Sequence, residues 1–495
     1  MPEKEITISL PSPAKRFYRH GWQSWSLAAW QDIGEKIAIP KPTLLHPMQY
    51  DPAYIYEQRP HGSSLGAVEM ENGKIILLGA LGLDAHVFLD SDQLIGQYES
   101  GTGKWFTAEG SEEKVFEQYA AALKETEFFE KTRFLHATPP TIWCSWYSFY
   151  THISEQNLNQ ALDDLGDLPF DVFQVDDGWQ RAIGDWVPNE KFPGGLDSLS
   201  TQIRRTGRTP GIWLAPLIVV PDSDIYRQHP EWLLRDEKGN LVSAGFNWNE
   251  PLYTLDTTIP AVFEWLSALM RQVRAWGFDY VKLDFLYAGA LPGVRKMPMK
   301  REQAYRLALE TMRESLGDAY LLTCGAPVIP SLGLCDGIRI GPDVASHWDS
   351  PRDDLYLNNF AIPGTRNAIR TTVNRLWLKP LVHTDPDVAY FASERNSMTT
   401  EQEKMLQDLA LVCNYKATSD IPAWLSELER KKLGDFLRTG EKSIEDIDFS
   451  VAMPIPEENL IQKILGAALG WAGSFPFVLR FFNWLGDKEL KKKID

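Results

Sequence analysis

The chain has 495 residues, of which 44% are hydrophobic and 24% charged. This length exceeds one ordinary domain and leaves room for a barrel of about 250–300 residues with added segments. The net charge of -17 argues against nucleic acid and other polyanions as partners, because the chain would repel phosphates. Aromatic residues make up 12% of the chain, and aromatic rings offer flat apolar faces to sugars. The composition therefore suits a neutral ligand.

The N-terminus and the cysteines indicate the cellular compartment. Residues 1–10 lack the basic and then apolar layout of a secretory signal. The cysteines are scattered, without a CxxC pair, at Cys144, Cys324, Cys335 and Cys413. These features predict a cytoplasmic protein with reduced thiols. Because the sequence has no HExxH, no HxH and no acidic calcium loop, we expect neither a metal nor another cofactor.

Residues 1–130 are predicted to form an N-terminal β domain. Short apolar runs such as Lys74–Leu78 and His86–Leu89 alternate with turn residues, and a helix is expected around residues 112–127. Pro139-Pro140 then marks a change of pattern. We therefore place a second domain at residues 131–430 and a C-terminal extension at 431–495.

Strands and helices are predicted to alternate from Thr141 onward. Helical spacing of apolar residues is clear at 261–276 and 301–316. Candidate strands lie at 142–147, 171–176, 211–216, 280–284, 320–324, 337–340, 380–383 and 415–419. Eight such strands predict an α/β fold, a (β/α)8 TIM barrel preceded by a β-sandwich-like domain and followed by a short C-terminal extension. The rival, a doubly wound open sheet, usually has a GxGxxG after a strand, and this sequence has none there.

The C-terminal extension contains an uncharged segment from Ile464 to Leu479, interrupted by Pro476. A membrane-spanning helix needs about 20 apolar residues, so we expect no membrane span. One interpretation is a helix packed on the barrel. The alternative is an interfacial or homo-oligomer contact, favoured by the many aromatic residues of this tail and by the lysines at 491–493.

Two aspartates follow short apolar runs of the repeating segment. Asp284 ends the run that begins at Tyr280, and Asp343 follows Arg339-Ile340-Gly341-Pro342. If both runs are parallel strands of one barrel, both carboxylates project from its C-terminal rim, where barrel enzymes build their active sites. Two carboxylates facing one sugar are the minimum equipment for cleaving a glycosidic bond.

Other candidate residues follow neighbouring strands. Asp176 and Asp177 can accept hydrogen bonds from vicinal sugar hydroxyls, or can simply stabilise a turn. Lys282 lies on the same strand face as Asp284 and can keep that carboxylate ionised, with a structural salt bridge as the alternative. Trp213 is a candidate stacking wall or a core residue, and a lone cysteine such as Cys324 is most often a core residue.

Several short motifs now identify a family. They are Gly21-Trp22-Gln23-Ser24-Trp25, Trp143–Tyr147, Phe173–Gly178, Gly184–Trp186, Pro210–Trp213, Val281–Phe285 and Arg339–Asp343. In these motifs and their order the chain resembles the glycoside hydrolase family 36 α-galactosidases, especially the short bacterial type.

The resemblance implies retaining hydrolysis of terminal α-D-galactosides of the melibiose and raffinose type. Asp284 matches the family nucleophile and Asp343 its acid/base, which lie about 5–5.5 Å apart in retaining enzymes. Asp176 and Asp177 match the pair that binds the 4- and 6-hydroxyls. Trp22 or Trp25 would close the mouth of the pocket. The remaining substrate-binding residues implied are Trp146, Trp213, Lys282, Cys324 and Arg339.

The sequence also departs from the family. A longer β-sandwich usually precedes the Trp-Gln-Ser-Trp motif and a small β domain follows the barrel, whereas here the motif starts at residue 21 and the tail is predicted to be helical. We therefore expect a shortened N-terminal domain. Three other functions stay open: a galactosyl transferase of the raffinose-synthase kind, an α-N-acetylgalactosaminidase and a non-catalytic sugar-binding protein.

Overall fold

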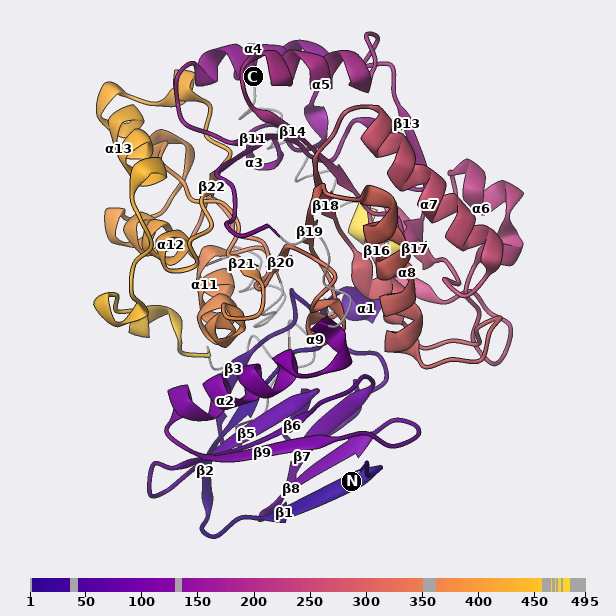
Figure 1. Ribbon diagram of the computed structural model, residues 1–495, viewed down its shortest axis with the longest axis vertical. Helices are drawn as coiled ribbons and strands as arrows, with labels where there is room; N and C mark the ends of the chain where they lie inside the picture. Colours follow the sequence, from indigo (N-terminus) through magenta and orange to yellow (C-terminus); the bar gives the residue numbers. More distant parts are fainter. Residues whose placement is uncertain are drawn as a thin grey trace.

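The computed structural model describes residues 2–35, 43–129, 136–349 and 362–455, together with 464, 468, 471–472 and 475–480. Figure 1 shows two parts, a β-rich N-terminal part below and a larger α/β part above it. The helix α2 (Glu112–Lys124) lies along the boundary between the two parts.

The N-terminal part is a β-sandwich. One antiparallel sheet has the order β1-β8-β7-β4 and the other β3-β2-β5-β6-β9. The first contains β1 (Glu5–Ser9), β4 (His61–Ser63), β7 (Ala85–Asp90) and β8 (Gln93–Tyr98). The second contains β2 (Ala14–Arg19), β3 (Ala29–Asp32), β5 (Leu65–Met70), β6 (Ile75–Ala80) and β9 (Trp105–Gly110). Buried residues from both sheets, among them Phe17, Leu78 and Val87, pack into one apolar cluster. The β-sandwich predicted from the sequence is confirmed.

The second part is a barrel of eight parallel strands. They are β10 (Ile142–Cys144), β11 (Val172–Val175), β14 (Thr209–Leu214), β18 (Tyr280–Leu283), β19 (Tyr320–Thr323), β20 (Gly337–Arg339), β21 (His383–Asp385) and β22 (Ala417–Thr418). Each pairs with the next in chain order up to β21, and β22 pairs back with β10. Between β21 and β22, the Ala389 N–H donates to the Ala417 carbonyl at 2.8 Å. The predicted TIM barrel is confirmed.

Helices cover the outside of the barrel (Figure 1). They include α4 (Glu155–Leu165), α5 (Leu196–Arg205), α7 (Pro260–Ala275), α8 (Arg301–Leu316), α11 (Thr365–Val373), α12 (Thr400–Val412) and α13 (Glu427–Arg438). In α5, the buried residues Leu196, Leu199 and Ile203 recur at helical spacing, so one face packs inward. The strands are buried on both faces, as expected in a parallel barrel.

The predicted position of the seventh strand was wrong. The apolar run that begins at Pro380 suggested a strand at residues 380–383, but β21 occupies His383–Asp385. The amides of Leu381 and Val382 both donate to the Leu378 carbonyl, so this run closes a turn before the strand starts. The strand therefore ends in polar residues that the prediction overlooked.

One buried arginine joins the β-sandwich to the barrel. Arg375 follows α11 and is completely buried. Its guanidinium donates to the carbonyls of Gly21, Gln23, Ser24 and Ser26, at 2.6–3.0 Å, and to the Ile340 carbonyl at 3.0 Å. The first four carbonyls belong to the loop that carries Trp22 and Trp25, whereas Ile340 follows β20. This contact fixes the loop against the barrel rim.

We expect Arg375→Met to lower the free energy of unfolding by at least about 3 kcal/mol, because it leaves several buried carbonyls without donors. Urea unfolding measures the change. Arg205→Met, at an exposed position on α5, is the matched control and is expected to change stability by less than about 0.5 kcal/mol. Equal stability of the two variants would contradict the role assigned to Arg375.

An antiparallel hairpin lies in the loop between β14 and β18. Its strands β16 (Ser243–Asn247) and β17 (Glu250–Thr254) pair with each other, and β17 also pairs with β15 (Ile218–Val219). Near its tip, Arg480 donates to the Asn249 carbonyl at 2.8 Å and pairs with Glu250 at 3.2 Å. Within the predicted tail helix at 464–479, residues 465–467, 469–470 and 473–474 lie outside the described residues, and the described residues 464, 468, 471–472 and 476–479 are helical.

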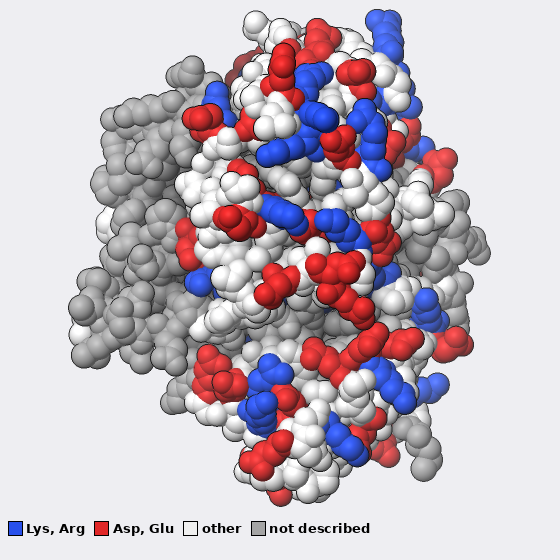
Figure 2. All heavy atoms as spheres, turned by 90° about the vertical axis from the view of Figure 1, so that its left-hand side faces the viewer, with Lys and Arg blue, Asp and Glu red and all other residues white. Residues whose placement is uncertain are grey.

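On the face drawn in Figure 2, acidic and basic side chains are interspersed over the described residues. In the described part of the chain, no helix is long and apolar enough to cross a membrane.

Candidate active site

Asp284 lies directly after β18 and is held by two N–H donors. The Trp213 indole donates to Oδ2 at 3.0 Å, and the Phe285 amide donates to Oδ1 at 2.8 Å. Phe285 adopts a left-handed backbone conformation with φ +55°, which is unusual for a bulky residue. Asp284 is only 7% exposed. Both carboxylate oxygens of Asp284 therefore accept an N–H donor.

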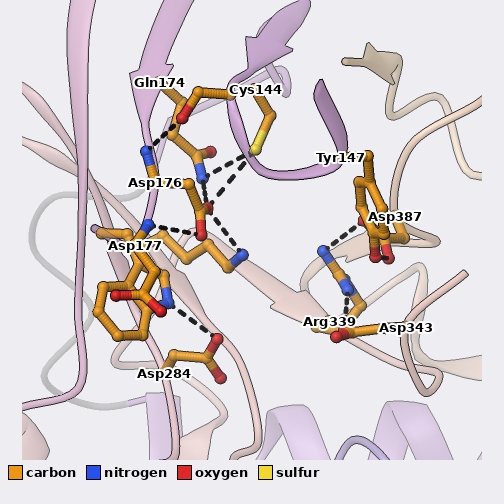
Figure 3. Close-up of polar contacts among 12 residues, drawn as sticks. Cys144, Tyr147, Gln174, Asp176, Asp177, Asp284, Arg339, Asp343 and Asp387 are labelled. Atoms are coloured by element: carbon orange, nitrogen blue, oxygen red, sulfur yellow. Dashed lines mark hydrogen bonds and ion pairs between the residues drawn. The ribbon is translucent and has the colours of Figure 1, made fainter. Parts of the chain in front are cut away.

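Asp176 and Asp177 lie after β11 in a second group (Figure 3). Asp176 pairs with Lys282 Nζ at 3.1 Å and accepts a hydrogen bond from Gln174 at 2.5 Å. Burial alone would lower the pKa of Lys282, but the carboxylates of Asp176 and Asp284 raise this pKa well above its usual value. Lys282 is therefore a fixed positive charge between the two aspartates. The salt bridge considered as an alternative exists, and it lies within the site.

Asp177 is buried and accepts hydrogen bonds from two side chains. Gln180 donates to Oδ1 at 2.6 Å and the Trp248 indole to Oδ2 at 2.7 Å. Burial raises the pKa of Asp177 to about 6, although both hydrogen bonds oppose that shift. Each oxygen keeps acceptor capacity for a hydroxyl donor.

Arg339, at the end of β20, binds three carboxylates. Its Nε donates to Asp385 at 2.8 Å, Nη1 to Asp343 at 3.0 Å and Nη2 to Asp387 at 2.8 Å. Tyr147 also donates to Asp387. Figure 3 shows this cluster beside the group formed by Asp176, Asp177 and Asp284. One guanidinium thus orders the carboxylates that follow β20 and β21.

Asp343 has a pKa suited to proton transfer near neutrality. Burial and the Asp387 carboxylate raise its pKa to about 7, although Arg339 and Lys282 act in the opposite direction. Its side chain is still 32% exposed, so it can meet a ligand. The site therefore pairs a carboxylate held by N–H donors, Asp284, with one that readily keeps a proton.

The chain is similar to known α-galactosidases. The melibiase family model matches residues 106–321. The α-galactosidase AgaA of Geobacillus stearothermophilus is 28% identical over 218 residues, and the α-galactosidase of Escherichia coli is 27% identical over 194 residues. These matches cover 41% and 37% of this chain, but only 28% and 27% of those relatives.

Solved structures cover much more of the chain. TtGalA, an α-galactosidase from Thermus thermophilus in complex with p-nitrophenyl α-D-galactopyranoside, is 46% identical, with a TM-score of 0.84 and 89% of each chain covered. The chain belongs to glycoside hydrolase family 36. The crystal structure of the family 36 AgaA has a TM-score of 0.60 at 15% identity, covers 88% of this chain and 61% of that chain, and confirms the shared fold.

The structure brings together most of the residues predicted for a family 36 site. Asp284, Trp213 and Lys282 lie at the ends of β14 and β18, and Arg339 contacts Asp343. Cys324 is completely buried, and burial and Asp284 raise the pKa of its thiol well above the usual value. The thiol is therefore neutral. Its complete burial agrees with a core residue, and its electrostatic interaction with Asp284 places it near the candidate substrate-binding residues.

The three predicted tryptophans differ in position. Trp25 packs edge-on against Phe285, with ring centroids 5.0 Å apart, and so lies beside the residue that follows Asp284. Trp22 contacts Tyr287 and the Arg301 guanidinium and is 3% exposed. Trp146 lines a cleft of about 700 Å³ together with Asp177 and Trp248. Trp25 is thus the more suitable candidate for the pocket wall.

Sequence reasoning missed Asp385, Asp387, Tyr147, Gln174 and Trp248. The first two were lost through the misplaced seventh strand. Gln174 is two residues before Asp176 and therefore on the same strand face, a spacing that could have revealed it. Trp248 is brought to Asp177 by the hairpin β16–β17, and no local pattern in the sequence indicates that contact.

One cluster of potential metal ligands binds an arginine side chain instead. Ligand atoms of Asp51, His86 and Glu99 lie within 4.8 Å of one another. However, the Arg301 guanidinium binds Asp51 at 2.7 and 2.9 Å and also pairs with Glu99. This cluster therefore connects the β-sandwich to α8 through an ion pair.

We expect Asp387→Asn to move the alkaline limb of the pH profile to lower pH. The Asp387 carboxylate raises the pKa of Asp343, so its removal lowers that pKa. If Asp343 acts as the general acid, kcat/KM then begins to fall about one pH unit earlier. The measurement is kcat/KM between pH 4 and 9. Asp385→Asn is the control, since Asp385 also binds Arg339 but is not among the groups that shift Asp343; an equal shift in both variants would contradict the assignment.

Proposed function

We propose that the protein is a retaining α-galactosidase that hydrolyses terminal, non-reducing α-D-galactosides of short oligosaccharides. The observation that carries this proposal is the different environment of the two carboxylates: N–H donors surround Asp284, while burial and Asp387 raise the pKa of Asp343 to about 7. A nucleophile must be ionised and an acid must hold a proton, so these environments match the two roles. The 46% identity to TtGalA, solved with an aryl α-galactoside and with stachyose, supports the choice of sugar.

The reaction would proceed by double displacement. Asp284 attacks the anomeric carbon while Asp343 protonates the leaving oxygen, which produces a β-linked galactosyl ester on Asp284 and a free alcohol. Asp343, now ionised, removes a proton from water, and the water oxygen displaces Asp284 from the anomeric carbon. Galactose leaves with the α configuration, and both carboxyl groups return to their first state. The Lys282 ammonium would balance the charge of Asp284 as it leaves, and the Trp213 indole would donate a hydrogen bond to it.

Asp176, Asp177 and Arg339 would bind the galactose hydroxyls. Two adjacent carboxylates with N–H and ammonium donors already in place present their remaining lone pairs in fixed directions. Hydroxyl groups are good donors to such acceptors. Their fixed orientation would distinguish galactose from its 4-epimer, glucose.

The other functions receive less support. An α-N-acetylgalactosaminidase needs room for a 2-acetamido group, and Cys324-Gly325 resembles the galactosidase form more closely. A non-catalytic sugar-binding protein would not need an acid with a pKa near 7. A galactosyl transferase would share every residue named here and differs in how well the acceptor site excludes water. The four cysteines are free and buried, which supports a cytoplasmic location.

The test is the hydrolysis of p-nitrophenyl α-galactoside beside the α-glucoside and the α-N-acetylgalactosaminide. NMR identifies the anomer that is released first. We expect α-galactose, from the galactoside only. Release of β-galactose would refute the retaining mechanism. Faster cleavage of the α-glucoside or of the α-N-acetylgalactosaminide would refute the proposed specificity for galactose. Product analysis with added raffinose or sucrose separates hydrolysis from transfer.

A further inference from the structure

A tryptophan occupies a turn whose backbone disfavours it. In the hairpin β16–β17, Asn247 pairs with Glu250, so Trp248 and Asn249 form a two-residue turn. Their φ angles are +48° and +62°. Turns of this kind favour glycine, asparagine and aspartate, because a bulky side chain is strained at positive φ. Strain of this sort persists where surrounding contacts outweigh it, and it is frequent at functional sites.

The contacts of Trp248 lie inside the proposed site. Its indole N–H donates to Asp177 Oδ2 at 2.7 Å. Its ring centroid lies 5.1 Å from that of Phe285, the residue after Asp284, and 6.2 Å from that of Trp213, which itself donates to Asp284. Trp248 thus connects the Asp177 carboxylate with the aromatic residues around Asp284.

This contact determines how Asp177 can meet a ligand. Gln180 holds Oδ1 and Trp248 holds Oδ2, so the plane of the carboxylate is fixed by two donors on different loops. Asp177 is 2% exposed, and it lines the cleft of about 700 Å³ together with Gln180 and Trp248. Without the indole N–H, the carboxylate could rotate about its remaining contact with Gln180, and its free lone pairs would lose their fixed direction.

We propose that Trp248 is a positioning residue for sugar specificity, which acts by fixing Asp177 toward one hydroxyl of the galactose ring. The inference rests on the proposed function. It deepens that function, because it assigns the recognition of one hydroxyl to a pair formed by Asp177 and a strained turn residue. Substrates that lack this hydroxyl gain nothing from the pair, so Trp248 contributes to the preference for galactose rather than to turnover in general.

The experiment compares Trp248→Phe with the wild type on aryl α-galactoside and on its 4-deoxy and 6-deoxy analogues. Phenylalanine keeps an aromatic ring in the turn and removes the N–H donor. We expect kcat/KM for the galactoside to fall about 10- to 100-fold, the range of a lost hydrogen bond to a charged group. For one of the two deoxy analogues, Trp248→Phe should lower kcat/KM less than about threefold, because the hydroxyl bound by Asp177 is already missing from that substrate. An equal loss on all three substrates would indicate a merely structural role and overturn the proposal.

A double-mutant cycle gives a second, independent test. If Trp248 acts through Asp177, then Trp248→Phe adds little to the loss already caused by Asp177→Asn, whereas independent effects would multiply. Multiplied effects would refute the proposal. Trp265→Phe, a half-buried tryptophan on α7, is the matched control and is expected to leave the ratios between substrates unchanged.

The outcome separates this proposal from the proposed function. A wild type that cleaves no α-galactoside would contradict the function itself. In that case, calorimetric binding of galactose and the two deoxygalactoses to wild type and Trp248→Phe makes the same comparison without turnover. Loss of discrimination in the variant supports the role of Trp248, and unchanged discrimination refutes it.

Discussion

Asp284→Ala is expected to reduce kcat/KM for an aryl α-galactoside by about 10⁴-fold or more, the scale of losing a covalent nucleophile. The substitution removes the atom that would form the galactosyl ester, and no other described carboxylate contacts both Trp213 and the Phe285 amide. The fold should persist, because Asp284 lies at the rim after β18 rather than in the core. Steady-state kinetics and circular dichroism make the measurement.

Added azide sharpens this test. A small anion can enter the space left by Asp284 and attack the anomeric carbon from that side, giving β-galactosyl azide and partial recovery of turnover. Asp318→Ala, at an exposed position (83%), is the control and should retain full activity. Substantial activity of Asp284→Ala without azide would remove the nucleophile assignment.

Asp343→Ala is expected to cost about 10²–10⁴-fold with poor leaving groups such as the sugar of melibiose. With dinitrophenyl galactoside the first step should be nearly intact, because that leaving group needs no proton. Water attack then becomes slow, so a burst of phenol and accumulation of the galactosyl enzyme are expected. Rapid-quench kinetics and intact-protein mass spectrometry detect them.

The pH dependence provides the second readout for Asp343. Burial and Asp387 raise its pKa to about 7, so in the wild type kcat/KM falls as the pH rises through about 7 and the acid becomes ionised. In Asp343→Ala this alkaline limb should disappear. Azide should now give α-galactosyl azide, the opposite anomer from that expected with Asp284→Ala. Equal losses on melibiose and dinitrophenyl galactoside would contradict the acid role.

The sequence predicted the barrel well because strands such as β11, β14, β18 and β19 are short buried runs rich in apolar residues, and amphipathic helices lie between many of the strands. Asp176 and Asp284, directly after such runs, and Asp343, four residues after the end of β20, could be located for the same reason. The prediction of the seventh strand was wrong because the apolar residues Leu381 and Val382 are buried in a turn and not in a strand. A shift of a few residues was enough to hide Asp385 and Asp387.

Contacts between distant segments could not be predicted. Trp248 meets Asp177 across 71 positions of sequence, and Arg375 meets the loop 21–26 across about 350. Neither contact follows from helical or strand spacing. Both depend on how a hairpin or a separate β-sandwich packs on the barrel, which is a property of the tertiary fold.

Arg375 contacts only main-chain carbonyls of the loop 21–26. Every residue type supplies the same carbonyl, so this anchor places no demand on the side chains of the loop. Natural variation or laboratory evolution can therefore exchange Trp22 or Trp25 without releasing the loop from the barrel rim. Substitutions of these two tryptophans can therefore change which leaving groups the pocket accepts. The positions of the catalytic carboxylates on the barrel stay constant meanwhile.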